Sequence, residues 1–220
     1  MSAPGVVGFD LDGTLIDSVE GIHSSLVVAC EALQLPSPTL ERLRRRIGPA
    51  LPHYLPDLLG LTSDQQEGVL AELLPLFRVH HDQQGWRGYQ LYEGVPAMLK
   101  ALVSDGWELH MVTQKPRQVA EKILEDAGLT RSFQSLQAPD GSAFSKGASL
   151  QALRRGGVPQ HWYVGDTEAD QRAAAAAGFR FVAATYGYGD CPVADARISA
   201  PLELLVALAT PAQAHLRMRQ

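Results

Sequence analysis

The spacing of hydrophobic positions divides the chain into segments of two kinds. A short apolar run at 6–9 ends abruptly at a polar, glycine-containing stretch, which is typical of a buried strand that enters a loop. From Asp17 or Ser18 onward, apolar residues recur at helical spacing, and no strand is indicated between 16 and 90. We therefore expect 16–90 to be almost wholly helical, with Pro75 kinking or splitting its last helix.

Strand and helix patterns alternate in the rest of the chain. This alternation predicts an α/β fold with a doubly wound, Rossmann-like parallel sheet. We expect a core made of residues 1–15 and 91–220, with residues 16–90 inserted after the first strand as an all-helical domain. The expected later strands are 108–112, 133–136, 161–164 and 181–184, and the expected helices are 94–103, 116–127, 146–155, 167–177 and 202–209.

Polar side chains follow successive strands of this predicted sheet. Ligands of open parallel sheets bind beyond the carboxyl ends of the strands, so residues at those ends are expected to converge. The side chains expected at this edge are Asp10, Asp12, Thr113, Lys146, Asp166 and Asp170. Each alone has an ordinary explanation as a turn residue, a helix cap or a surface lysine. Their joint placement at successive strand ends favours a functional site.

The chemistry of this set favours phosphoryl transfer. Four carboxylates at close quarters repel one another, and a hard cation such as Mg²⁺, which prefers oxygen ligands, resolves the repulsion. A carboxylate beside Mg²⁺ can attack phosphorus and form an aspartyl-phosphate. Thr113 and Lys146 would then hold the phosphoryl oxygens during transfer.

Other known motifs do not fit the sequence. The stretch from Asp10 lacks the glycine and the final glutamate of an EF-hand, and the chain has no P-loop or dinucleotide-binding glycine pattern. The histidines form no HExxH motif, and the pair at 80–81 is most simply a solvated helix face.

Composition and charge narrow the classes of partner. The 220 residues include 19 Lys and Arg against 24 Asp and Glu, a net charge of −5 that argues against nucleic-acid binding. No apolar run is long enough to span a membrane, and the first residues lack the pattern of a signal peptide. Cys30 and Cys191 stand far apart, so we expect two reduced thiols in a cytoplasmic protein.

Four stretches resemble the motifs of the haloacid dehalogenase (HAD) superfamily of phosphohydrolases. Residues 9–18 (FDLDGTLIDS) resemble the first motif, Val112-Thr113 the second, Lys146 the third, and residues 164–170 (VGDTEAD) the fourth. The similarity covers nearly the whole chain, because the helical insert at 16–90 resembles the cap domain of this superfamily.

The resemblance implies a role for each motif residue. Asp10 would be the nucleophile, and Asp12 would protonate the leaving group and then activate water. Asp10, the backbone carbonyl of Asp12, and Asp166 would hold Mg²⁺, with Asp170 in support, while Thr113 and Lys146 would bind the phosphoryl group. Dehalogenases of this superfamily lack an acid at the position of Asp12, so the resemblance favours a phosphatase.

Several further stretches resemble the phosphoglycolate phosphatase-like branch, which also holds 5′-nucleotidase-like and pyrophosphatase-like enzymes. They are residues 47–49, 91–95, 113–116 and 186–189. Gln114 stands where Asn or Ser is usual and is expected to contact substrate. Lys115 is the reserve candidate for the third-motif lysine. In the arginine cluster at 42–46, a solvated face and a substrate role are equally favoured, and Arg46 is the best candidate to meet an anionic leaving group.

Three functions remain open at this point. The favoured one is a Mg²⁺-dependent phosphatase that acts on a small-molecule phosphate ester through an aspartyl-phosphate. The alternatives are a phosphomutase of the β-phosphoglucomutase type and a non-catalytic binding domain on the same scaffold. The partner is expected to be a phosphorylated small molecule, with no nucleic acid and no membrane, and the protein to be a monomer or homodimer.

Overall fold

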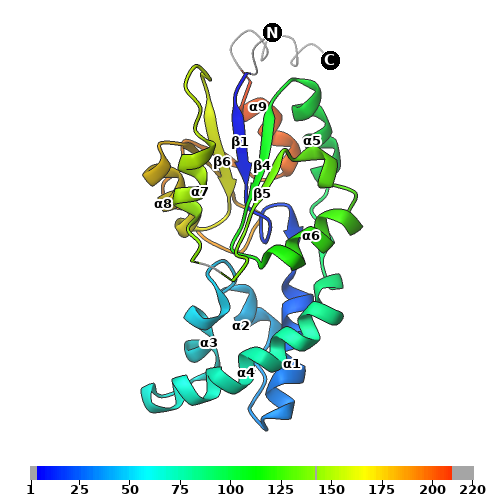
Figure 1. Ribbon diagram of the computed structural model, residues 1–220, viewed down its shortest axis with the longest axis vertical. Coiled ribbons are helices and arrows are strands. Elements are labelled where there is room, and N and C mark those ends of the chain that lie inside the picture. The colour runs from blue at the N-terminus through cyan, green and yellow to red at the C-terminus, as the bar shows by residue number, and fades with distance from the viewer. Residues whose placement is uncertain (1–3, 142, 210–220) are drawn as a thin grey trace.

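A six-stranded parallel sheet forms the centre of the computed structural model, which describes residues 4–141 and 143–209 (Figure 1). The strand order is β5-β4-β1-β6-β7-β8, and every pair is parallel. The α/β fold predicted from the alternation is therefore confirmed. The strands are β1 (Val6–Phe9), β4 (Glu108–Val112), β5 (Ser135–Gln137), β6 (His161–Gly165), β7 (Arg180–Ala184) and β8 (Ala196–Ile198).

The central strand β1 is buried on both faces. All four of its residues are buried, and Val7 lies opposite Leu109 of β4 and Trp162 of β6. Continuous apolar runs suit strands that have helices on both sides. The helices of the sheet are α5 (Val95–Ser104), α6 (Arg117–Asp126), α7 (Lys146–Leu153), α8 (Glu168–Ala177) and α9 (Leu204–Ala207), with 3-10 turns η2 (Thr130–Ser132) and η3 (Pro201–Glu203).

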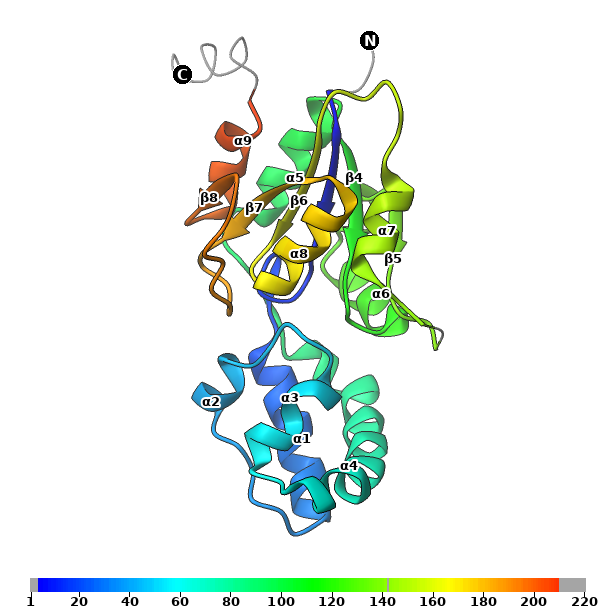
Figure 2. The ribbon, with the colours of Figure 1, turned by 90° about the vertical axis from the view of Figure 1, so that its left-hand side faces the viewer.

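Two apolar clusters fasten these helices to the two faces of the sheet. One cluster joins α5, α6 and α9 to residues such as Phe9, and the other joins α7 and α8 to residues such as Tyr163. Figure 2 shows α7 and α8 on the side of the sheet opposite α5. The core thus has three layers, with β1 in the middle of the central layer.

The helical insert forms a separate body beyond the carboxyl ends of the strands (Figures 1 and 2). Its own apolar cluster is built around Leu26, Leu55 and Leu73. We propose for it the boundaries expected from the sequence, 16–90, with the core at 1–15 and 91–220. Its helices are α1 (Val19–Ala32), α2 (Leu40–Arg44), α3 (Leu51–Leu59), α4 (Ser63–Gln83) and the 3-10 turn η1 (Gly85–Arg87).

One local prediction, the absence of strands between 16 and 90, was wrong, and one strand of the sheet was not predicted. A two-stranded antiparallel ladder, β2 (Ile16–Asp17) with β3 (Gln90–Leu91), stands where no strand was expected, because the chain enters and leaves the cap side by side. Helix α4 continues through Pro75 rather than splitting, and its packing on α1 supports it there. The edge strand β8 is too short to show a strand pattern. In the described part of the chain, no helix has the length and apolar character of a membrane span.

Candidate active site

The polar residues expected at the strand ends meet at one edge of the sheet. Asp10 follows β1, Thr113 follows β4 and Asp166 follows β6, while Lys146 opens α7 and Asp170 lies in the first turn of α8. All five side chains are buried. The backbone N–H of Asp10 donates to the carbonyl of Val164 at 2.9 Å and so fixes Asp10 against the neighbouring strand.

Three carboxylates form a cluster that suits a divalent cation. Asp10, Asp166 and Asp170 each offer an oxygen, and these oxygens lie within 4.8 Å of one another. Oδ1 of Asp10 and Oδ1 of Asp166 are buried and accept no hydrogen bond from any residue that the structure describes. Buried carboxylate oxygens without partners are costly, and a hard cation ligated by both would satisfy them. The donor set therefore fits Mg²⁺.

Lys146 compensates part of the negative charge. Its Nζ atom lies 2.8 Å from Oδ2 of Asp10 and 2.6 Å from Oδ1 of Asp170. Burial raises the pKa of Asp10 to about 6, although the Lys146 charge works in the opposite direction. Burial and the two neighbouring carboxylates also raise the pKa of Asp166 well above its ordinary value. The site without a cation therefore resists full ionisation.

Asp170 is the least available of the three carboxylates. Besides Lys146, it accepts hydrogen bonds from the Thr167 backbone nitrogen at 3.1 Å and the Thr167 hydroxyl at 2.6 Å. The Thr167 hydroxyl in turn caps α8 by accepting from the Asp170 backbone nitrogen, a reciprocal capping box. These contacts suit Asp170 to orient Lys146 and the loop rather than to be a principal ligand.

Asp12 lies apart from this cluster and has a different partner. Its Oδ1 atom is 2.9 Å from Nζ of Lys115 and accepts a hydrogen bond from the Ser18 hydroxyl at 2.5 Å. Burial opposes ionisation of Asp12, but Lys115 and Ser18 together hold its pKa below the ordinary value. The two lysines thus serve different aspartates, and Lys146, not the reserve candidate Lys115, is the one beside Asp10.

Glycines allow two loops to close around Asp166. Gly13 has φ +76°, and a Cβ atom there would lie 2.1 Å from Oδ2 of Asp166. A Cβ at Gly187 would lie 2.3 Å from the Gly13 carbonyl oxygen and 2.4 Å from Cβ of Asp166. The β1 loop and the loop after β7 therefore reach Asp166 only because these positions carry no side chain.

A cleft of about 370 Å³ lies between the core and the cap. Asp12, Gln114 and Lys115 line it from the core, and the substrate contact expected of Gln114 stays a prediction. Arg46 does not line it; its guanidinium pairs with Asp57 within the cap. The arginine in the cleft wall is Arg78 of α4, which the sequence analysis did not single out.

The histidine pair of α4 is only partly the solvated face that was expected. His81 is buried, stacks on Phe77 with ring centroids 5.0 Å apart, and lines the cleft. Burial and the nearby Lys115 charge lower the pKa of His81 to about 4, although Asp12 works against them. His81 is therefore a neutral part of the cleft wall at physiological pH.

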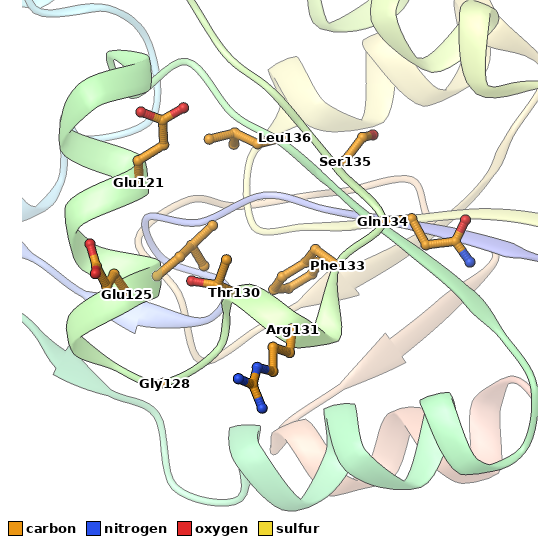
Figure 3. Close-up of a pocket in the computed structure, with 10 residues that line it drawn as sticks. Glu121, Glu125, Gly128, Thr130, Arg131, Phe133, Gln134, Ser135 and Leu136 are labelled. Carbon is orange, nitrogen blue, oxygen red and sulfur yellow. The ribbon is translucent and has the colours of Figure 1, made fainter.

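A second hollow, of about 840 Å³, is lined by residues between Glu121 and Leu136. Figure 3 shows it between α6 and the edge strand β5, with Glu121, Glu125, Arg131 and Phe133 among its lining residues. None of the strand-end residues lines it. Its greater volume therefore does not make it the catalytic site.

The fold and the four strand-end motifs define a hydrolase class. The chain belongs to the haloacid dehalogenase-like hydrolase family, whose model matches residues 7–184. This confirms the resemblance found in the sequence.

Two phosphoglycolate phosphatases and a protein named as a tyrosine kinase resemble this chain at similar levels of sequence identity. A phosphoglycolate phosphatase of Aliivibrio fischeri is 33% identical over 202 residues, covering 87% of this chain and 89% of the relative. A phosphoglycolate phosphatase of Cereibacter sphaeroides is 32% identical, with 87% and 89% covered. The tyrosine-protein kinase PtkA of Mycobacterium tuberculosis is also 32% identical, covering 88% of this chain and 66% of the relative.

Solved structures share the whole architecture. A haloacid dehalogenase-like hydrolase from Streptococcus pneumoniae superposes with a TM-score of 0.82 at 26% identity, covering 93% of this chain and 98% of the other. The structure of PtkA from Mycobacterium tuberculosis gives a TM-score of 0.77 at 29% identity, with 96% and 100% covered. Core and cap thus occur together in these relatives.

Proposed function

We propose that this protein is a Mg²⁺-dependent phosphatase that hydrolyses a small-molecule phosphate monoester through an aspartyl-phosphate on Asp10. The observation that carries the proposal is the geometry around Asp10. One of its oxygens accepts from Lys146, and the other is buried without a partner among the described residues. An oxygen in that state can ligate a cation or attack phosphorus. The family membership and the phosphatase relatives support the same reaction.

The first half of the reaction assigns a task to each side chain. An oxygen of Asp10 forms a bond to phosphorus as the bond from phosphorus to the leaving-group oxygen breaks, and Asp12 donates a proton to that oxygen. Lys146 and Thr113 hold the phosphoryl oxygens. Bound Mg²⁺, held by Asp10, Asp166 and the Asp12 carbonyl, would neutralise charge on the phosphoryl group.

The second half returns the site to its resting state. Asp12, now ionised, takes a proton from water, which attacks phosphorus as the bond from phosphorus to Asp10 breaks. Asp12 gives this proton to solvent when the phosphate leaves and Lys115 pairs with it again. The ion pair with Lys115 keeps Asp12 ionised in the resting site, which suits this step. We expect a bound phosphate to draw Lys115 from Asp12, so that the pKa of Asp12 rises and Asp12 takes up a proton from solvent before it protonates the leaving group.

The leaving group would occupy the cleft beneath the cap. Phosphoglycolate-like esters, which carry a second anionic group, fit the names of the phosphatase relatives. Arg78 is our candidate for meeting that group. Three arginines of α2 and its C-terminal end have carboxylate partners, whereas Arg78 lines the cleft and forms no ion pair with any described carboxylate. Nucleotides and pyrophosphate are the competing substrates.

A phosphatase panel with Mg²⁺ tests the function. The panel contains phosphoglycolate, nucleoside monophosphates, sugar phosphates, pyrophosphate and a generic aryl phosphate. We expect phosphate release that a chelator and Asp10→Asn both abolish. Conversion of a hexose 1-phosphate into an isomer without phosphate release would identify a mutase. No turnover of any member would favour a binding domain.

A further inference from the structure

Tyr188 is a core residue that reaches across to the cap. It lies in the loop after β7, and its ring packs against the apolar cluster of the cap. Its hydroxyl accepts a hydrogen bond from the backbone nitrogen of Ser18 at 2.7 Å and donates one to Oδ1 of Asp17 at 2.8 Å. Tyr188 therefore contacts the residues through which the chain enters the cap.

The backbone of the same residue is fixed to the carboxylate cluster. The Tyr188 N–H donates to Oδ2 of Asp166 at 2.8 Å. A Cβ atom at Gly189 would lie 2.5 Å from the Asp166 carbonyl oxygen, and Gly187 is equally confined. The two flanking glycines thus let this loop lie directly on Asp166. This close contact fixes the backbone from which the Tyr188 side chain extends.

Ser18 connects Tyr188 to the proposed acid. Its backbone nitrogen is held by Tyr188, and its hydroxyl donates to Oδ1 of Asp12 at 2.5 Å. A second path reaches the cap helices, because Arg44 pairs with Asp17 at 2.7 Å and lies 5.6 Å from the centre of the Tyr188 ring. Tyr188 is thus the junction of contacts to Asp166, to the start of α1 and to α2.

We propose that Tyr188 is a positioning residue that holds the first turn of α1 so that Ser18 orients the Asp12 carboxylate. Among the described residues, the hydrogen bonds of Tyr188 reach Ser18, Asp17 and Asp166 but neither Asp10 nor Asp12, so its hydrogen-bonded route to Asp12 passes through Ser18. This inference rests on the proposed function, because it concerns the proton transfer that we assign to Asp12. It also implies that the proton transfer requires the contact between Tyr188 and the start of the cap.

Tyr188→Phe removes the hydroxyl and keeps the ring and the backbone N–H. Because Asp12 acts in the chemical step rather than in binding, we expect kcat to fall about tenfold with KM nearly unchanged. Because the Ser18 amide loses its acceptor, we expect faster hydrogen exchange in the peptide that contains it. Mg²⁺ affinity, measured by calorimetric titration, should be unchanged, because the bond from the Tyr188 N–H to Asp166 remains.

Tyr186→Phe is the matched control. The Tyr186 hydroxyl, in the same loop, donates to the Thr14 carbonyl at 2.9 Å, so this variant loses a bond to the β1 loop but none to Ser18. We expect it to leave exchange at Ser18 and kcat near wild-type values. Equal effects in the two variants, no effect in Tyr188→Phe, or a weakened Mg²⁺ affinity there would each overturn the route through Ser18. The exchange measurement needs no turnover, so it stands apart from the test of Asp10.

Discussion

The ammonium group of Lys146 lies between Asp10 and Asp170, 2.8 Å from the first carboxylate and 2.6 Å from the second. All three side chains are buried. One positive charge therefore faces a cluster of three carboxylates, and the remaining imbalance is what a divalent cation would correct. This charge balance, and the separate pair formed by Asp12 and Lys115, determine how the site should respond to substitution, pH and Mg²⁺.

Removing the Lys146 charge should destabilise the protein severely. Lys146→Met leaves Asp10 and Asp170 buried without their cation, and breaking a buried ion pair typically costs about 3–5 kcal/mol. Urea unfolding in a chelator would measure the loss, and saturating Mg²⁺ should restore part of it. Lys100→Met, at an exposed position of α5, is the control and should unfold like wild type. Equal stability of the two variants would contradict the proposed charge balance.

The metal-free site should make stability depend on pH through Asp10. Its pKa is about 6 in the folded protein against an ordinary 3.8. The folded state thus binds the proton more tightly, and the stabilisation is present below about pH 4 and lost as the pH rises through 6. Without metal, the free energy of unfolding of Asp10→Asn should rise relative to that of wild type by on the order of 2–3 kcal/mol as the pH increases across this window. Saturating Mg²⁺ should reverse the ranking, and a pH-independent difference would contradict the account.

Lys115 should control the ionisation of Asp12. Lys115→Met removes the charge that lowers the pKa of Asp12, so that pKa should rise. The limb of the kcat/KM profile that reports Asp12 in the free enzyme, where Lys115 pairs with it, should move to higher pH. The exposed-position control Lys100→Met should leave the profile in place. If this limb does not move in Lys115→Met, Asp12 is not the group whose ionisation controls the proton transfer.

Glycine at position 13 should be needed for two reasons. The backbone there has a positive φ, and a side chain would disturb Asp166 and weaken cation binding. Gly13→Ala places a Cβ 2.1 Å from the Asp166 carboxylate, at φ +76°. Gly128→Ala is a matched control, because Gly128 has φ +68° with nothing within 4 Å of the added Cβ. Both variants should lose about 1 kcal/mol from backbone strain, but only Gly13→Ala should bind Mg²⁺ at least tenfold more weakly. Equal Mg²⁺ affinities would show that the loop yields without disturbing Asp166.

Arg78 should select esters with a second anionic group. Arg78→Ala should lower kcat/KM for phosphoglycolate about 10- to 100-fold, since a charged hydrogen bond contributes about 1.5–3 kcal/mol, and should change turnover of phenyl phosphate little. Arg46→Ala, whose arginine pairs with Asp57 outside the cleft, should change neither. A loss of equal size for both substrates in Arg78→Ala would exclude a role in recognising the second anion.

The strand-end argument predicted the carboxylate cluster because parallel strands bring their carboxyl ends to one edge. Asp10 and Asp166 follow strands that pair directly, so their proximity depends only on topology. The partners of the two lysines were beyond this argument. Lys115 follows Thr113 by two residues, yet its side chain pairs with Asp12 and not with Asp10.

The sequence predicted that the cap is helical, but it did not predict which face of each helix lines the cleft. Arg46 stands at the end of α2, and the turn there directs it to Asp57. Arg78 lies three residues before His81, so one face of α4 carries both into the cleft wall. Tyr188 is separated from Ser18 by 170 residues, and no local pattern could reveal their contact.

The central claim, that Asp10 forms the covalent intermediate, is tested most directly by trapping the phosphoryl group. Wild-type protein with Mg²⁺ and a substrate identified by the panel would be quenched in acid during turnover, and its peptides analysed by mass spectrometry. We predict a labile phosphoryl group on the peptide that contains Asp10, absent from Asp10→Asn. Full turnover with no phosphoryl group on that peptide, or with the group on another residue, would contradict the account.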